Sequence, residues 1–117
     1  MIRTLMAIDA ATLFIASAIH FGLLGAIDPF EAAALPEAVI GAVLAFGLIG
    51  AIFWWPSWWP AALGATLFAV VGTLVGLRFM LPRGELGDIV YHVGLLATLV
   101  MLLVMLARER PRARKPA

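Results

Sequence analysis

Four apolar runs of about 20 residues occupy most of this 117-residue chain. A helix needs roughly 20 predominantly apolar residues to cross the hydrocarbon core of a bilayer. The runs cover residues 5–27, 36–53, 59–80 and 88–107. Hydrophobic residues make up 64% of the chain and charged residues only 13%, which leaves too little polar surface for a water-soluble globule. We therefore expect an all-α fold in which residues 1–107 form one four-transmembrane-helix bundle.

The ends of the runs carry helix-start and turn signals. Pro36 suits the first turn of the second helix, because its missing N–H would be unpaired there anyway, and Glu37 lies favourably at the positive helix end. Asp88 is expected to cap the fourth helix. Residues 54–60 place four tryptophans around two prolines. Tryptophan settles at the membrane–water interface, so this segment predicts a tight interfacial hairpin.

Basic residues near the helix ends predict the orientation in the membrane. The tail, residues 108–117, contains five arginine or lysine residues, and Arg3 adds a positive charge near the other end. Positive residues favour the cytoplasmic side, so we expect both termini in the cytoplasm and the chain in a bacterial-type inner membrane. The opposite loops are acidic or mixed in charge, with Asp28 and Glu31 in the first of them. The tail is charged and rich in proline, which predicts disorder.

Small residues are frequent, and they matter because helices in lipid associate through close packing. The chain has 11 glycines, of which Gly72 and Gly76 form a GxxxG motif in the third run. This motif predicts close helix packing, first within the chain and second between copies in a homo-oligomer. The expected partners are therefore the bilayer and such an oligomer or a larger membrane complex. The sequence contains no nucleic-acid-binding motif.

The two histidines are the most informative polar residues. His20 lies seven residues before the end of the first run, roughly 10 Å deep, and His92 lies four residues after Asp88, about 6 Å from the same face. Antiparallel helices would bring both histidines to a similar depth at the outer side of the membrane. Glu37 and Arg78 are expected at the same end. The sequence therefore predicts a cluster of histidine, carboxylate and arginine side chains there.

These residue types fit two classes of cofactor. Two imidazoles with a carboxylate suit zinc or copper(II), which gives a candidate metal site of His20, His92, Glu37 and Asp88. Two imidazoles alone could be the axial ligands of a haem, with Arg78 near its propionates. The chain has no cysteine, which excludes thiolate and iron–sulfur sites. A structural interpretation stays open, with carboxylates as caps, the arginine snorkelling and the histidines hydrogen-bonding between helices.

A second hypothesis rests on Asp9, an ionisable residue within the first run. Asp9 and His20 are 11 residues apart, close to three helical turns, so they share one face with Thr12 between them. In length and number of spans the chain is similar to the small multidrug resistance transporters, whose first helix carries a membrane-embedded glutamate. The resemblance covers architecture only, and Asp9 is the nearest counterpart of that glutamate. Asp9 lies near the cytoplasmic end of its run instead of at the middle.

No spacing pairs a nucleophile with a base, so we do not expect an enzyme. Ser17 is a poor nucleophile candidate because nothing ties it to His20. The sequence predicts a small multi-pass membrane protein, an accessory or interaction subunit whose histidine and carboxylate cluster holds a transition metal or haem. The alternative is a small proton- or cation-coupled transporter that uses Asp9 and the outer polar cluster.

Overall fold

The computed structural model describes residues 1–23, 25 and 31–111, which form four α-helices and one short 3-10 helix. The elements are α1 Ile2–His20, α2 Glu31–Ile52, α3 Trp58–Met80, η1 Leu81–Arg83 and α4 Leu86–Arg108. The four α-helices contain 19 to 23 residues, so they are about 28 to 35 Å long, close to the thickness of the bilayer core. All four are long and apolar enough to cross a membrane. The expectation of an all-α bundle of four such helices is confirmed.

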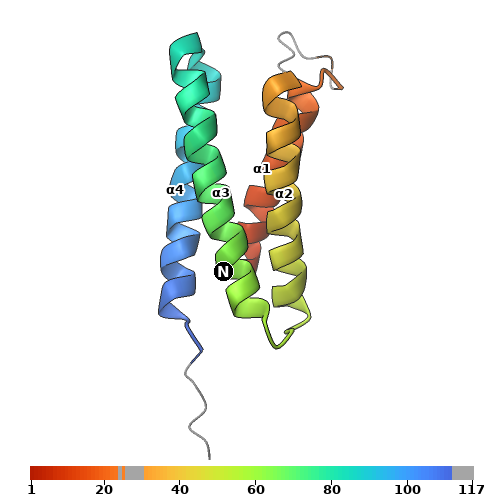
Figure 1. Cartoon of the computed structure of the whole chain (residues 1–117), viewed down its shortest axis with the longest axis vertical. Helices are drawn as coiled ribbons and strands as arrows, with labels where there is room; N and C mark the ends of the chain where they lie inside the picture. The colour runs from red at the N-terminus through yellow and green to blue at the C-terminus, as the bar shows by residue number, and fades with distance from the viewer. Residues whose placement is uncertain (24, 26–30, 112–117) are drawn as a thin grey trace, which may run out of the picture.

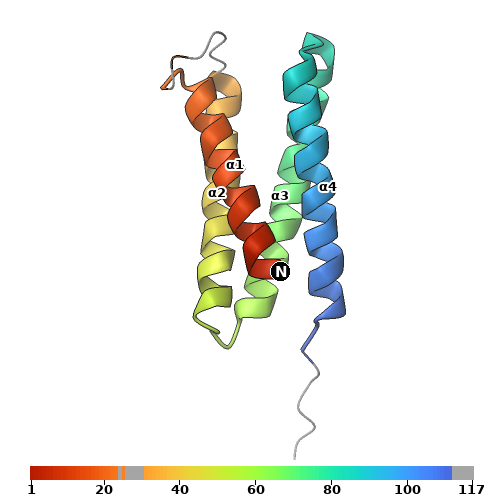
Figure 2. The ribbon, with the colours of Figure 1, turned by 180° about the vertical axis from the view of Figure 1, so that it is seen from behind.

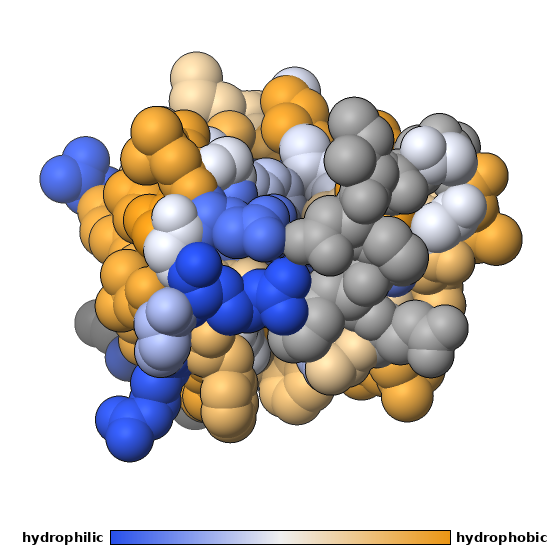
Figure 3. All heavy atoms as spheres, turned by 90° about the horizontal axis from the view of Figure 1, so that it is seen from above, coloured by the Kyte–Doolittle hydropathy of each residue, from blue (hydrophilic) through white to orange (hydrophobic). Residues whose placement is uncertain are grey.

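The helices pack in a ring, in which each α-helix contacts the next one in sequence and α1 also contacts α4 (Figures 1 and 2). Successive helices run in opposite directions, so the connection between α2 and α3 lies at the same end as Met1 and the end of α4. The other end carries η1, the end of α1 and the beginning of α2. Seen from that end, hydrophilic side chains gather centrally and apolar side chains surround them (Figure 3).

The first helix is shorter than the apolar run. It ends at His20, because Gly22 adopts a left-handed backbone conformation with φ of 75°. The N–H groups of Gly22 and Leu23 donate to the carbonyl oxygens of Ile19 and Ala18, which is the pattern of a Schellman helix end. Residues 24, 26 and 27 of the expected span lie outside the described residues. His20 is therefore the last residue of a helix instead of lying two turns inside one.

Two expected helix starts were also wrong. Helix α2 begins at Glu31, so Pro36 lies inside the helix and not in its first turn. Helix α4 begins at Leu86 after an extended residue, Glu85, and Asp88 lies in the first turn without capping the helix through its side chain. In both places the helix begins before the expected start: residues 31–35 precede Pro36 in α2, and Leu86 and Gly87 precede Asp88 in α4.

The core contains leucine, alanine and methionine side chains from all four helices, whereas larger apolar side chains cover the outside. This distribution suits lipid as the surrounding solvent. Gly47 on α2 lies close to the backbone of α3. A methyl group added there would lie 3.0 Å from both Ala65 Cβ and Met6 Cε and 3.3 Å from Ala62 Cα. Glycine at this position allows α1, α2 and α3 to meet.

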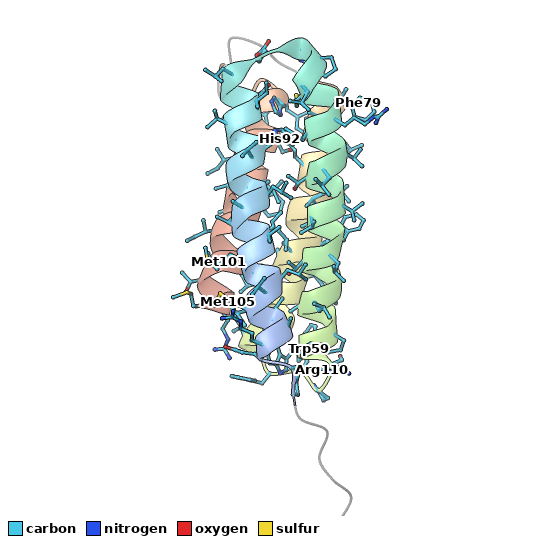
Figure 4. All side chains as sticks on the ribbon, turned by 90° about the vertical axis from the view of Figure 1, so that its left-hand side faces the viewer. Trp59, Phe79, His92, Met101, Met105 and Arg110 are labelled. Carbon is cyan, nitrogen blue, oxygen red and sulfur yellow. The ribbon has the colours of Figure 1, made fainter. Side chains whose placement is uncertain are left out.

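Tryptophans hold the chain ends against the connection between α2 and α3. Nε1 of Trp59 donates a hydrogen bond of 2.9 Å to the carbonyl oxygen of Leu106. The guanidinium carbon of Arg3 lies 4.5 Å from the ring centre of Trp54. The guanidinium carbon of Arg110 lies 6.0 Å from that of Trp59, and Figure 4 shows both residues at the lower end of the bundle. The remainder of the tail, residues 112–117, lies outside the described residues.

Candidate functional site

Four ionisable side chains from three helices meet at the end of the bundle that carries η1. His20, at the end of α1, places Nδ1 2.6 Å from Oε2 of Glu37 on α2. The other ring nitrogen, Nε2, lies 3.6 Å from Oδ1 of Asp88 on α4. His92 places Nδ1 2.8 Å from the carbonyl oxygen of Asp88, one turn earlier in α4. We call these four residues the polar cluster.

The backbone explains why the four residues meet. Glu37 and His92 each lie six residues after the first residue of their helix, about 9 Å along the axis. Helices α2 and α4 both start at this end, and α1 ends there. His20, Glu37 and His92 are buried, and Asp88 is the most exposed member of the polar cluster. These contacts place the four residues at one end of the bundle, as the sequence predicted, and do not test what the residues do.

The two histidines are engaged in different ways. Both ring nitrogens of His20 face carboxylates. In His92 a backbone carbonyl, which can only accept, faces Nδ1, so Nδ1 carries a proton, and in the neutral form of the ring Nε2 holds a lone pair. A methyl group added at Gly76 on α3 would lie 3.1 Å from Nε2. Glycine at position 76 thus leaves space beside this nitrogen.

A cavity of about 690 Å³ adjoins the polar cluster between α2 and α3. Its walls are mostly apolar, and its polar lining side chains are Glu37, Thr73 and His92. Oε1 of Glu37 and Oγ1 of Thr73 are buried and have no hydrogen-bond partner among the described residues. Thr73 lies seven residues before the end of α3, about 10 Å along the axis, at a depth similar to that of Glu37 and His92. Figure 4 shows His92 on the inner side of α4.

Thr73 is a site residue that the sequence analysis missed. It lies between the two glycines of the GxxxG motif, and the motif predicts a role for the glycines alone. A polar side chain three residues before Gly76 shares its helix face, and this spacing is the signal that could have identified it.

The structure does not place Arg78 with the histidines. Arg78 is exposed on α3 and lines a separate surface hollow of about 500 Å³ with Leu74, Leu77, Leu81 and Pro82. Within residues 1–23, 25 and 31–111, no group of three or more histidine, aspartate or glutamate residues is arranged to hold a metal ion. Of the atoms predicted to bind a metal or haem, Nε2 of His92 is one that belongs to a residue lining the cavity. The metal and haem interpretations stay predictions.

Asp9 lies apart from the polar cluster, deep in the contact between α1 and α4. Only 1% of its surface is exposed. Thr98 on α4 donates a hydrogen bond of 2.7 Å to Oδ1 of Asp9, while Oδ2 has no hydrogen-bond partner among the described residues. Thr12, which was expected to share one helix face with Asp9 and His20, donates to the backbone carbonyl of Asp9 at 2.9 Å. Thr98 is a second polar partner that the sequence analysis did not identify.

Comparisons with protein-family models, with curated proteins and with solved structures found no match. The polar cluster, the cavity beside it and the buried Asp9 are therefore the features on which a function for this chain can be based.

Proposed function

We propose that this chain is a small accessory subunit of a bacterial-type inner membrane that holds a ligand in the cavity between α2 and α3. The observation that carries the proposal is the convergence of Glu37, Thr73 and His92, from three different helices, on one otherwise apolar cavity. Ligand sites commonly have volumes of roughly 300 to 1,000 Å³ and combine apolar walls with a few convergent polar groups. The cavity of about 690 Å³ fits this description.

The burial of these polar groups supports a binding role over a purely structural one. An ionisable side chain inside a bilayer costs about 3 kcal/mol on insertion scales, so each one requires a partner or a function. The contact of Glu37 with His20 uses only Oε2 of the carboxylate. Oε1 of Glu37 and Oγ1 of Thr73 lack partners among the described residues although both residues line open space. Neither oxygen has accessible surface, so a bound ligand would supply these partners once the two side chains turn toward the cavity.

The same contacts support a binding role over a catalytic one. Ser17 directs its hydroxyl to the carbonyl oxygen of Ala34 at 2.6 Å, so this hydroxyl is engaged in holding α1 against α2. His20 faces two carboxylates instead of a nucleophile. A ligand held at His92 can be presented to a partner in a homo-oligomer or a larger membrane complex, which is the role we assign to an accessory subunit.

The composition of the purified protein tests this proposal. We expect protein purified in mild detergent to retain a small molecule, seen by mass spectrometry of an organic extract, or a haem or metal, seen by absorption and metal analysis. Ala33→Phe, which adds a ring to the cavity wall, should reduce the retained amount. Val100→Phe adds the same ring at a half-exposed position of α4 outside the cavity and serves as the control. A parent protein without any retained compound, metal or chromophore would contradict the proposal.

The burial of Asp9 favours a second candidate, a proton- or cation-coupled transporter. A carboxyl group with one oxygen bonded to Thr98 and the other without a partner among the described residues can exchange a proton during a cycle. Under this hypothesis Asp9→Asn abolishes proton-coupled flux in proteoliposomes but preserves the fold. Flux that is unchanged in the variant, or absent from the parent protein, would remove the hypothesis.

A further inference from the structure

The cavity between α2 and α3 faces the side of the bundle that lipid would cover. Leu35 on α2 and Phe79 on α3 belong to its lining and are 63% and 65% exposed, and Val75, another lining residue, is half exposed. Figure 4 shows Phe79 pointing away from the bundle. A molecule would therefore reach the cavity from the hydrocarbon of the membrane, and its body must be apolar.

The polar wall of the cavity is rich in hydrogen-bond acceptors. In the neutral form of His92, Nε2 holds a lone pair, because Nδ1 carries the single proton and donates to the carbonyl oxygen of Asp88 at 2.8 Å. Oε1 of Glu37 is a second acceptor, since Oε2 of the same carboxylate pairs with His20. The hydroxyl of Thr73 can donate or accept. The head of a ligand that satisfies this wall has to donate hydrogen bonds.

We propose that the cavity binds a lipid-soluble molecule whose polar head is a hydroxyl group that donates a hydrogen bond to Nε2 of His92. This inference rests on the proposed function and adds the class of ligand to it. Gly76 is part of the site, because any larger residue would occupy the space from which the hydroxyl reaches the nitrogen. A carbonyl head would place its own lone pairs against the acceptors of His92 and Glu37 and leave them without a donor.

Quinols and long-chain alcohols both carry a hydroxyl on an apolar body, and matched probes separate these two sources. Decylubiquinol and decylubiquinone share one skeleton and differ in whether the head carries hydroxyl or carbonyl groups. Dodecanol carries a hydroxyl without the aromatic ring. Binding to the full chain in lipid nanodiscs, measured anaerobically from the ligand dependence of the unfolding temperature, gives an apparent Kd for each probe.

We expect the quinol to bind about tenfold or more tightly than the quinone, the factor typical of one buried hydrogen bond left unmade. Gly76→Ala, whose methyl group would lie 3.1 Å from Nε2, should weaken quinol binding several-fold. Gly64→Ala on the same helix meets no described atom within 4 Å and should leave it unchanged. Thr73→Val, which replaces the hydroxyl by a methyl group, should weaken quinol binding less than Gly76→Ala does. Dodecanol binding as tight as that of the quinol would identify the alcohol alone as the recognised group.

Two results would overturn the inference, and only the second would also contradict the proposed function. If the quinone binds as tightly as the quinol while Gly76→Ala still weakens binding, the hydroxyl assignment is wrong and the cavity remains a ligand site. If no probe shows binding that Gly76→Ala reduces, and no compound is retained on purification, the proposed function fails as well. The ratio of the apparent Kd values for quinone and quinol is measured on the parent protein alone, so it does not depend on the stability of any variant.

Discussion

Gly47 provides the sharpest test of how the bundle is held together. In the structure, Gly47→Ala adds a methyl group 3.0 Å from Ala65 Cβ and 3.3 Å from Ala62 Cα. Both atoms belong to α3 and cannot rotate away, so the helix itself has to shift. Met6 Cε, also at 3.0 Å, is the end of a flexible side chain and can move. We expect this substitution to force α2 and α3 apart.

The magnitude follows from two opposing effects. Alanine is favoured over glycine within a helix by up to about 1 kcal/mol. Overpacking a tight contact costs about 1 to 3 kcal/mol. Gly64→Ala, at a position with no described atom within 4 Å of the added methyl group, gains only the first effect. The preference of the helix for alanine cancels between the two variants, so Gly47→Ala should be less stable than Gly64→Ala by about 1 to 3 kcal/mol.

The free energy of unfolding can be measured for both variants by titration with a denaturing detergent, followed by circular dichroism. Gly72→Ala adds an informative comparison, because its methyl group would lie 2.5 Å from Ile40 Cδ1, a shorter distance than any at Gly47. Ile40 lines the cavity and its side-chain end can turn into open space, so Gly72→Ala should cost less than Gly47→Ala. Equal stability of Gly47→Ala and Gly64→Ala would refute the claim that backbone approach at Gly47 limits the packing.

Three further predictions concern other parts of the chain. Thr98→Val removes the donor to the buried Asp9 and should lower the free energy of unfolding by about 1 to 3 kcal/mol, measured by the same titration; no loss would mean that Asp9 finds another donor. Trp59→Phe removes the hydrogen bond to Leu106 and should cost about 1 kcal/mol and speed hydrogen exchange at the end of α4, whereas unchanged exchange would show that the bond does not hold this end. Reporter fusions should place the C-terminus and the connection between α2 and α3 in the cytoplasm, because the tail is basic; a periplasmic C-terminus would reverse the orientation.

The bundle could be predicted from the sequence because lipid imposes a length and an apolar composition on each helix. The helix ends could not be predicted in the same way. Apolar character continues beyond His20, yet Gly22 in a left-handed conformation ends α1 there. Backbone geometry decides such a boundary, and the apolar run does not reveal it. Glycine often ends a helix, so Gly22 was a possible helix end in the sequence, but the apolar run that continues past it predicted a longer helix.

The GxxxG motif shows a different limit. Gly72 and Gly76 lie on the face of α3 that meets the interior, but the atoms nearest to them belong to the side chains of Ile40 and His92. By contrast, a methyl group at Gly47, which no motif marked, would meet a backbone atom of α3, Ala62 Cα, at 3.3 Å. Spacing along one helix identifies a face, whereas the partner of that face depends on how the other helices cross it.

The polar cluster was predictable because the antiparallel order of four spans fixes which ends lie together. The cavity was not, since its volume depends on the side chains that α2 and α3 present to each other.

This difference bears on function. A cluster that served only packing would be complete once Nδ1 of His20 met Glu37 at 2.6 Å, and apolar side chains of similar volume often replace such buried pairs without loss of stability. Oε1 of Glu37 and Oγ1 of Thr73 have no partner among the described residues, although both residues line the cavity beside His92. Burying these oxygens adds a desolvation cost. A molecule in the cavity would offset that cost, which favours a binding site over a structural cluster.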